Sequence, residues 1–185
     1  MKTRHPSVLF LATAIVVLAA GASASGQEEP DAGSVATGAC TGETIELNGH
    51  EKRMLDLHNL TRFDYGLQPL CVHTALMEAA RAHSQEMLDG DYFGHASLDG
   101  GTSGDRLEGF GYTSYGYSYW AIGENIAWGT GRKALPDDRF DEWMGSSEHW
   151  PNILSEDFQE IGIGVRTGES YDAGTMYTVD FGTRG

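Results

Sequence analysis

Two stretches in the first half of the chain carry apolar residues at helical spacing. Asn48, a residue type that caps helix starts, comes before Met54, Leu57 and Leu60, and Gly66 provides a left-handed stop. This pattern predicts a first helix between residues 48 and 66. The second stretch has the spacing i, i+3, i+4, i+7 and i+11 at Leu76, Ala79, Ala80, His83 and Met87. This spacing predicts an amphipathic helix that ends near residue 90.

The last quarter of the chain has the alternation of β-strands. Isoleucine and valine alternate with glycine over residues 161–165, and a second β-rich run covers 176–181. A polar turn over 168–174 separates the two runs, so we expect a β-hairpin. Residues 122–128 are expected to form a short strand and 137–144 a third helix.

The middle of the chain has no sustained period. Residues 89–119 are rich in Gly, Ser, Asp and Tyr, and we expect loops and short strands there, where functional residues commonly lie. A short helical turn is expected to follow Pro151. Helices followed by strands, without an internal repeat, predict α+β layers rather than a parallel doubly wound sheet.

The first residues have the features of a signal peptide. Lys2 and Arg4 precede an apolar run over 8–20, and small residues occupy 22–24. We therefore expect residues 1–24 to be removed and the protein to be secreted. A membrane-spanning helix needs about 20 apolar residues, so an uncleaved anchor is the less favoured alternative.

The segment after the signal peptide contains few large apolar residues. We expect residues 25–47 to form a flexible acidic arm and residues 48–185 to form the folded domain.

Composition and charge exclude several partners. The 185 residues are 40% hydrophobic, enough for a real core, and 12 Lys+Arg face 27 Asp+Glu, a net charge of -15. Loss of Lys2 and Arg4 with the signal peptide makes the mature charge -17. Binding to nucleic acid or anionic lipid begins with basic residues, so we expect neither partner. No second long apolar run follows the signal peptide, so we expect no membrane span after cleavage.

Cys40 and Cys71 are the two cysteines of the chain. In an oxidising extracellular space they can pair within one chain only with each other, so we predict a disulfide; two free buried thiols are the alternative. Neither lies in a CxxC pair, which argues against a redox-active thiol or a thiolate metal site.

Three stretches, residues 91–97, 123–127 and 143–154, each contain a glycine and one titratable residue of interest: His95, Glu124 and His149. They are too far apart for a metal signature in which two ligands share a helix face, and hydrogen-bonded structural histidines are the ordinary interpretation. The chain has no GxSxG elbow, Walker A loop, HExxH pair or complete EF-hand loop.

A wider set of residues resembles the CAP superfamily, named for cysteine-rich secretory proteins, antigen 5 and pathogenesis-related 1 proteins, and in particular its bacterial, SCP-like branch. The resemblance covers about residues 48–182 in order. It rests on His58, Asn59 and Arg62; Gly66, Leu67, Pro69 and Leu70; Phe93 and His95; 123–127; Trp143, Met144, Ser146, His149 and 152–154; and 161–165 with 180–182.

The resemblance implies an α-β-α sandwich with a three- or four-stranded antiparallel sheet and a shallow cavity. His95 and His149 match the family's cavity histidines, and Glu124 matches the glutamate of its Gly-Glu-Asn motif. The position of a second cavity glutamate is Gly145 here, so any mechanism that needs that carboxylate lacks its residue. Two histidines and at most one carboxylate suit Zn²⁺ or another divalent cation held weakly.

An aromatic run precedes Glu124. Tyr115, Tyr117 and Trp120 could wall a ligand groove beside the cavity, for a sugar, a peptidoglycan stem or an acyl chain. Packing of these rings onto the helices is the ordinary alternative.

These features predict a secreted, monomeric extracellular module. Its His/Glu cavity is expected to bind a small ligand, lipid, cell-wall component or divalent metal rather than to run a defined reaction. The alternative enzyme is a metal-assisted hydrolase of peptides or cell-wall material with Glu124 as base. A structural or adhesive surface protein is a further alternative.

Overall fold

The computed structural model describes residues 34–37, 40, 42, 44–168 and 174–185. The expected signal peptide lies outside these residues. Within them, no helix has both the length and the apolar character needed to cross a membrane.

The described residues form both strands and helices. In order they are β1 Ser34–Thr37, β2 Thr44–Leu47, α1 Gly49–Asp64, β3 Cys71–Val72, α2 Thr74–Asp89, α3 Ser103–Gly109, β4 Trp120–Gly129, the 3₁₀ helix η1 Gly131–Ala134, α4 Pro136–Met144, α5 Trp150–Ile153, β5 Glu160–Thr167 and β6 Thr175–Arg184.

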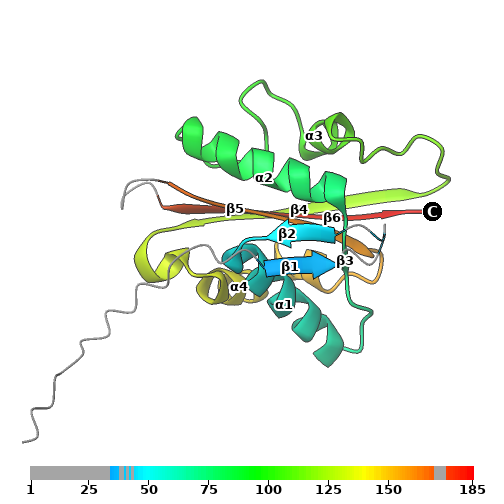
Figure 1. Ribbon diagram of the computed structural model, residues 1–185, viewed down its shortest axis with the longest axis horizontal. Helices are drawn as coiled ribbons and strands as arrows, with labels where there is room; N and C mark the ends of the chain where they lie inside the picture. The colour runs from blue at the N-terminus through cyan, green and yellow to red at the C-terminus, as the bar shows by residue number, and fades with distance from the viewer. Residues whose placement is uncertain (1–33, 38–39, 41, 43, 169–173) are drawn as a thin grey trace, which may run out of the picture.

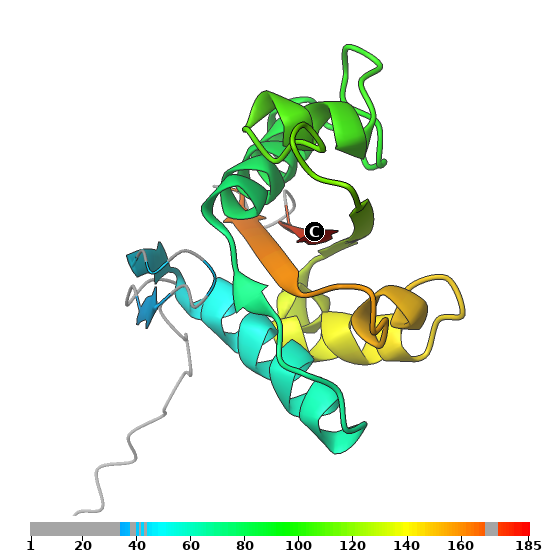
Figure 2. The same ribbon diagram turned by 90° about the vertical axis from the view of Figure 1, so that its right-hand side faces the viewer.

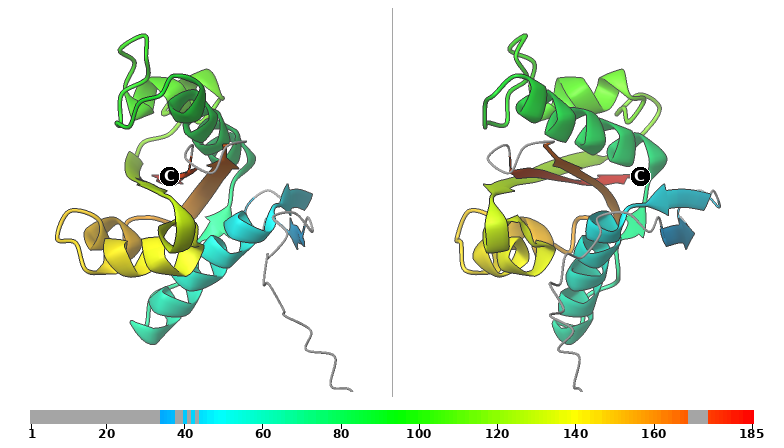
Figure 3. Two further views of the ribbon diagram at one scale, coloured as in Figure 1. Left: turned by 90° about the vertical axis from the view of Figure 1, so that its left-hand side faces the viewer. Right: turned by 60° about the vertical axis from the view of Figure 1, so that its left-hand side comes forward.

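Three layers build the domain. Helices α2 and α3 cover one face of a four-stranded sheet, and α1 and α4 cover the other (Figure 1). Figure 2 and Figure 3 show the same two helical layers from the sides. The strand order is β3-β5-β6-β4, and the last three strands are antiparallel neighbours. This α-β-α sandwich confirms the expected fold.

Strand β3 is the one parallel member of this sheet. It pairs with β5 through Cys71 opposite Glu160 and Val72 opposite Ile161. The expected pattern was wholly antiparallel. Parallel pairing follows because β3 reaches the sheet from helix α1 and continues into α2, rather than joining β5 through a hairpin.

Helix α1 begins where the sequence predicts. The Asn48 side chain accepts the Glu51 N–H at 2.9 Å, and the Glu51 carboxylate accepts the Asn48 N–H at 3.1 Å. This reciprocal capping box satisfies two backbone donors that a helix start otherwise leaves unpaired.

The buried face of α1 differs from the predicted one. Met54, His58 and Arg62 face the interior, whereas Leu60 is 59% exposed. The two polar side chains are accommodated because His58 Nδ1 bonds to the Met54 oxygen at 2.8 Å and Arg62 donates to backbone oxygens. Burial here follows hydrogen bonding as well as hydrophobicity.

Helix α2 packs onto β5 at backbone distance. A Cβ atom on Gly162 would lie 2.1 Å from the carbonyl carbon of Leu76, and one on Gly164 would lie 2.2 Å from that of Ala80. The two glycines that alternate with isoleucine and valine therefore remove side chains from the helix-facing side of the strand. The predicted α2 face, including Leu76, Ala80 and Met87, is buried.

Part of the expected flexible arm belongs to the domain. β1 pairs with β2, and Ile45 and Leu47 of β2 are buried in the main core. The stretch was expected to be solvated because two apolar residues among polar ones give a weak pattern. Burial of these two residues beside α1 stabilises the strand.

Cys40 and Cys71 form the predicted disulfide, with Cα atoms 5.6 Å apart. Its 31-residue separation corresponds to about 3–4 kcal/mol on the loop-entropy model.

The C-terminal half follows the sequence closely. Strand β4, helix α4, helix α5 and the β5–β6 hairpin all form at the predicted places. The segment expected to hold only loops and short strands contains α3, which begins with a capping box between Thr102 and Asp105. Its seven residues are too few to show a helical period in the sequence.

Candidate functional site

Strand β4 is one edge of the sheet, and segments from both helical layers lie beside it. A hollow of about 600 Å³ lies there. Its lining comes from the loop after α2, from β4, from α4 and from the segment before α5: Phe93, Gly94, His95, Ile126, Ala127, Trp128, Arg139, Glu142, Trp143, Ser146, Glu148 and His149. The structure thus brings His95 and His149 to one hollow, although they are far apart in sequence.

Side chains from the α4–α5 region cover the outer edge of β4. Asn152 donates to the Glu124 oxygen at 3.3 Å, Trp143 Nε1 to the Ile126 oxygen at 3.1 Å, and Arg139 to the Trp128 oxygen at 3.1 Å. Alternate carbonyls of an edge strand point outward and would otherwise be open to another strand. These contacts protect the edge and fix the segment that carries His149.

Glu124 holds His95 and Arg106 together. His95 Nδ1 lies 2.7 Å from Glu124 Oε1, and Arg106 forms an ion pair with Oε2 of the same carboxylate. The Glu124 side chain is 3% exposed, whereas that of His95 is 58% exposed. When Nδ1 carries the proton that is donated to Glu124, Nε2 of His95 is left for a ligand.

The pKa values follow from this arrangement. The hydrogen bond to Glu124 raises the pKa of His95 above its usual value. Burial opposes ionisation of Glu124, but the hydrogen bond from His95 and the charge of Arg106 prevail and hold its pKa below the usual range. Glu124 is therefore an anion that favours protonated His95.

Asp180 adds a second carboxyl behind Glu124. It lies opposite Glu124 in the β4–β6 register, is fully buried, and its carboxyl oxygens accept no hydrogen bond from the described residues. Burial, followed by the negative charge of Glu124, raises its pKa well above the usual range. The two carboxyls therefore favour a single negative charge on Glu124, which pairs with Arg106.

His149 is held by its own turn. Its Nδ1 lies 2.8 Å from Ser146 Oγ, its backbone oxygen accepts from Asn125 at 3.1 Å, and its ring stacks on Trp143 with centroids 6.4 Å apart. His149 and His95 line the same hollow from different layers.

The expected metal site depends on which side chains of the hollow are arranged to coordinate an ion. Among the described residues, no group of three or more His, Cys, Asp or Glu is arranged to hold a metal ion. Both oxygens of Glu124 are taken by His95 and Arg106, so its geometry is that of an orienting group rather than of the expected metal ligand. The two imidazoles fit at most a weakly held, exchangeable divalent ion.

The other acidic residues do not replace the missing glutamate. Glu142 lines the hollow but pairs with Arg139, and Glu148 lines its exposed rim. Gly145 ends α4 with a helical φ of -82°, and a Cβ there would meet only ordinary contacts at 3.5 Å and beyond. Nothing steric therefore requires glycine at this position.

The three aromatic residues of the expected groove do not line this hollow. Trp120 packs against the α2–α3 cluster, Tyr115 is 89% exposed, and the Tyr117 ring lies 4.9 Å from the Arg184 guanidinium. They are separated from His95 because β4 enters the sheet at Trp120 and reaches the hollow only at its other end. Phe93, Trp128 and Trp143 are the aromatic residues of the hollow.

The other histidines of the described residues have structural surroundings. His58 is buried among aromatic rings, and His83 lies in α2 with its Nε2 2.9 Å from the Gly94 oxygen, as the prediction of structural roles requires. His73 caps α2 through its Nδ1, and His50 stacks beside Tyr177.

Arg106 and Asp180 are site residues that the sequence interpretation missed. Arg106 belongs to the helix hidden in the irregular segment, so no period marked it. Asp180 stands in the closing motif of the family resemblance, and that motif was the available indication of a role.

A model of the cysteine-rich secretory protein family matches residues 55–181. The Bacillus subtilis protein YkwD, described as uncharacterized, is 34% identical over 145 residues, which are 78% of this chain and 51% of YkwD. The chain therefore spans about half the length of this curated relative.

Solved structures show the same similarity. A Bacillus anthracis extracellular protein containing an SCP domain superposes with a TM-score of 0.60 at 31% identity, over 72% of this chain and 40% of that one. An outer surface protein from Borrelia burgdorferi gives 0.62 at 19% identity, over 72% and 92%, and supports the fold alone. With the family model covering most of the domain, the chain belongs to the cysteine-rich secretory protein, or CAP, family.

Proposed function

We propose that this protein is an exported extracellular binding module whose β4-edge hollow takes a small ligand, with His95 and His149 as its recognition groups. One observation carries the proposal: two histidines from opposite helical layers line the same hollow, and each has its Nδ1 in a hydrogen bond. Such bonds fix the rings and direct Nε2 away from the supporting residue.

The ligand chemistry follows from the lining. Phe93, Trp128 and Trp143 supply flat apolar surface, and Glu142 and Glu148 supply carboxylates at the rim. A ligand with an apolar face and polar groups suits this combination, and a lipid or a cell-wall fragment has that character. Zn²⁺ can bind the two imidazoles weakly, with solvent or ligand atoms completing its coordination.

Calorimetric titration with Zn²⁺ tests the role of the two histidines. His95→Ala and His149→Ala should each lower the affinity at least about tenfold, because each removes one of two strong donors. His50→Ala is the matched control and should bind as the wild type does, since His50 lies beside Tyr177 and not in the hollow. Equal affinity in the wild type and the His95/His149 double variant would exclude the metal-binding part of the proposal.

A metal-assisted hydrolase receives less support from the geometry. Its base was expected to be Glu124, which is nearly inaccessible and already bonded to His95 and Arg106. The test is turnover of a peptide or muropeptide library by the mature chain. Turnover that is lost in Glu124→Gln would establish the enzyme in place of the binding module.

A further inference from the structure

The end of helix α1 carries an exposed apolar group, called here the α1-end patch: Leu60, Phe63 and Tyr65. Their exposures are 59%, 78% and 63%. Single exposed apolar residues are common, but several large ones close together at one helix end form the kind of patch that marks an interaction site. Figure 2 shows this end of α1 at the periphery of the molecule, away from the sheet.

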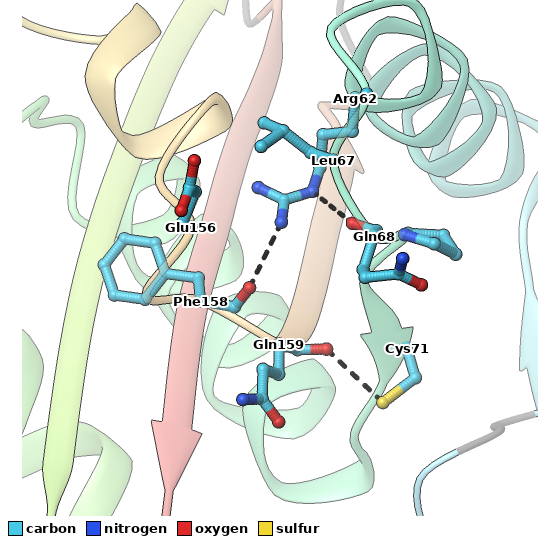
Figure 4. A pocket seen from close by; sticks show the side chains of 9 residues that line it. Arg62, Leu67, Gln68, Cys71, Glu156, Phe158 and Gln159 are labelled. Carbon is cyan, nitrogen blue, oxygen red and sulfur yellow. Dashed lines mark hydrogen bonds between the residues drawn. The ribbon is translucent and has the colours of Figure 1, made fainter.

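A second hollow, of about 640 Å³, is lined by Arg62 and Gly66, the chain neighbours of Phe63 and Tyr65. The turn after α1 forms one wall, with Leu67 and Pro69, and the segment before β5 forms another, with Phe158 (Figure 4). These apolar walls are accompanied by the amides of Gln68 and Gln159. An exposed apolar patch next to a partly apolar hollow is the usual anatomy of a docking site with an anchor pocket.

Arg62 lines this hollow and gives it a specific chemistry. The residue is 2% exposed, and its guanidinium donates to backbone oxygens at 2.8–3.2 Å; the acceptors are Gln68, Ile153, Ser155 and Phe158. No carboxylate pairs with it among the described residues. A planar cation with its edges held by neutral carbonyls can still attract the face of an aromatic ring.

The rim of the hollow is acidic. Glu156 lines it, and Asp64 and Asp157, next in the chain to Phe63 and Glu156, are exposed. Residues 63–71 and 154–159, which form the walls, contain no Lys or Arg. The field outside the hollow is therefore negative, in a chain that carries a net charge of -15.

We propose that the α1-end patch and this hollow dock a partner protein through a segment with one aromatic anchor flanked by Lys or Arg. The aromatic side chain enters the hollow against Arg62, its apolar neighbours cover Phe63 and Leu60, and its basic residues face Glu156 and Asp64. Apolar burial provides affinity, and the acidic rim selects basic flanks.

A second copy of this chain fits the surface less well. Self-association through a two-fold axis places the same patch on itself. Asp64, Glu156 and Asp157 of one copy would then approach those of the other, and like charges at an interface oppose association. The surface is therefore assigned to a basic partner, and the monomer stays a prediction.

The test is binding of the mature chain to a short labelled synthetic peptide with one central Trp between Lys and Leu residues, followed by fluorescence anisotropy. The Leu60→Ser/Phe63→Ser variant should lose at least about tenfold in affinity, because it removes the apolar contact without touching the core. Glu156→Lys should lose about threefold at low salt and little at about 0.5 M salt, where exposed charges are screened.

Matched variants on another surface separate this site from nonspecific attraction to an acidic protein. Tyr115→Ser removes an exposed ring elsewhere, and Glu108→Lys reverses an exposed charge on α3; both should keep the wild-type affinity. Equal losses in the patch variants and these controls would overturn the proposal, as would a wild type that binds no better than Leu60→Ser/Phe63→Ser. A concentration-dependent dimer that Leu60→Ser/Phe63→Ser abolishes would overturn it in favour of a second copy.

Discussion

Glu124 links the exposed part of the candidate site to its buried part. One of its oxygens holds His95 at the hollow, and the other holds Arg106 beneath it. Behind it, burial and the charge of Glu124 raise the pKa of Asp180, whose carboxyl oxygens accept no hydrogen bond from the described residues. The protonation state of His95 therefore depends on the carboxylate of Glu124, which is nearly inaccessible to a ligand.

Replacement of Glu124 by Gln tests this dependence. The variant removes the negative charge that favours protonated His95, so the pKa of His95 should fall to its usual value of about 6.5 or below. NMR titration of the His95 ring measures it. Glu148→Gln, at the rim of the same hollow, is the control and should leave the titration of His95 unchanged; an unchanged pKa in Glu124→Gln would contradict the assignment.

The sign of this shift also sets the pH dependence of metal binding. Because the folded-state pKa of His95 lies above its unfolded value of about 6.5, the proton competes with Zn²⁺ already above that pH. The stability that protonated His95 contributes is complete below the unfolded pKa and is lost as pH rises through the folded pKa.

His58 provides a contrasting histidine. Complete burial lowers its pKa to about 4, and its ring packs against Phe140 and Phe181. The neutral ring contributes stability above the unfolded pKa of about 6.5, and this is lost as pH falls towards 4.

The prediction for His58 compares it with a residue that cannot titrate. At about pH 7 the wild type should have a higher free energy of unfolding than His58→Gln. This advantage of the wild type should be smaller by about 2–3 kcal/mol at about pH 4.5. Urea denaturation at both pH values measures the two differences. A gap that stays constant with pH would show that His58 does not titrate as its burial requires.

At the scale of elements, the packing of α2 on β5 depends on two glycines. A methyl group at Gly162 or Gly164 would overlap the helix backbone, which cannot move aside as a side chain can. Gly162→Ala and Gly164→Ala should each lower the free energy of unfolding by about 3 kcal/mol or more. Denaturant titration measures the loss.

Gly49→Ala is the control for these variants. A Cβ on Gly49 has nothing within 4 Å, and alanine suits the first turn of α1, so this change should leave stability the same or slightly higher. Similar losses at all three glycines would mean that chain flexibility, and not close packing, decides their effect.

The elements that the sequence predicted well are those with a long, regular pattern. The α2 face and the β5–β6 hairpin have such patterns, and both formed as expected. Leu60 was misplaced because apolar spacing alone ignores buried polar residues such as Arg62. Three of the four carbonyls that hold Arg62 inward lie 91 or more residues later in the chain.

The sequence proposed members of the candidate site but not the contacts between them. The resemblance to the CAP family identified His95, Glu124 and His149, and the hollow brings the two histidines together. That Glu124 orients His95 instead of coordinating metal depends on Arg106, a partner from another element. Long-range contacts of this kind leave no periodic trace in a single sequence.

At the scale of the whole molecule, the sheet separates two surfaces with different chemistry. The β4 edge carries the histidine hollow, and the α1 end carries an apolar patch beside a buried arginine. Both lie on a strongly acidic chain. The net charge therefore influences stability as well as the choice of partner.

Repulsion among the acidic side chains predicts that added salt stabilises the fold. Acidic residues outnumber basic ones 27 to 12, so screening should relieve more repulsion than it weakens in surface ion pairs such as Arg53–Asp137. Raising sodium chloride from near zero to about 0.3 M should stabilise the mature chain by about 1 kcal/mol, or about 2–4 °C in melting temperature. Calorimetry in a salt series measures this.

A charge variant distinguishes screening from other effects of salt. Glu78→Lys, Glu108→Lys and Asp141→Lys reverse three exposed charges on α2, α3 and α4, which lie in both helical layers. Combined, they reduce the net negative charge by six, so the variant should melt higher at low salt and gain less from added salt than the wild type. If both proteins gain equally, the stabilisation comes from the general effect of salt on burial of apolar surface, and charge repulsion does not limit the stability of this fold.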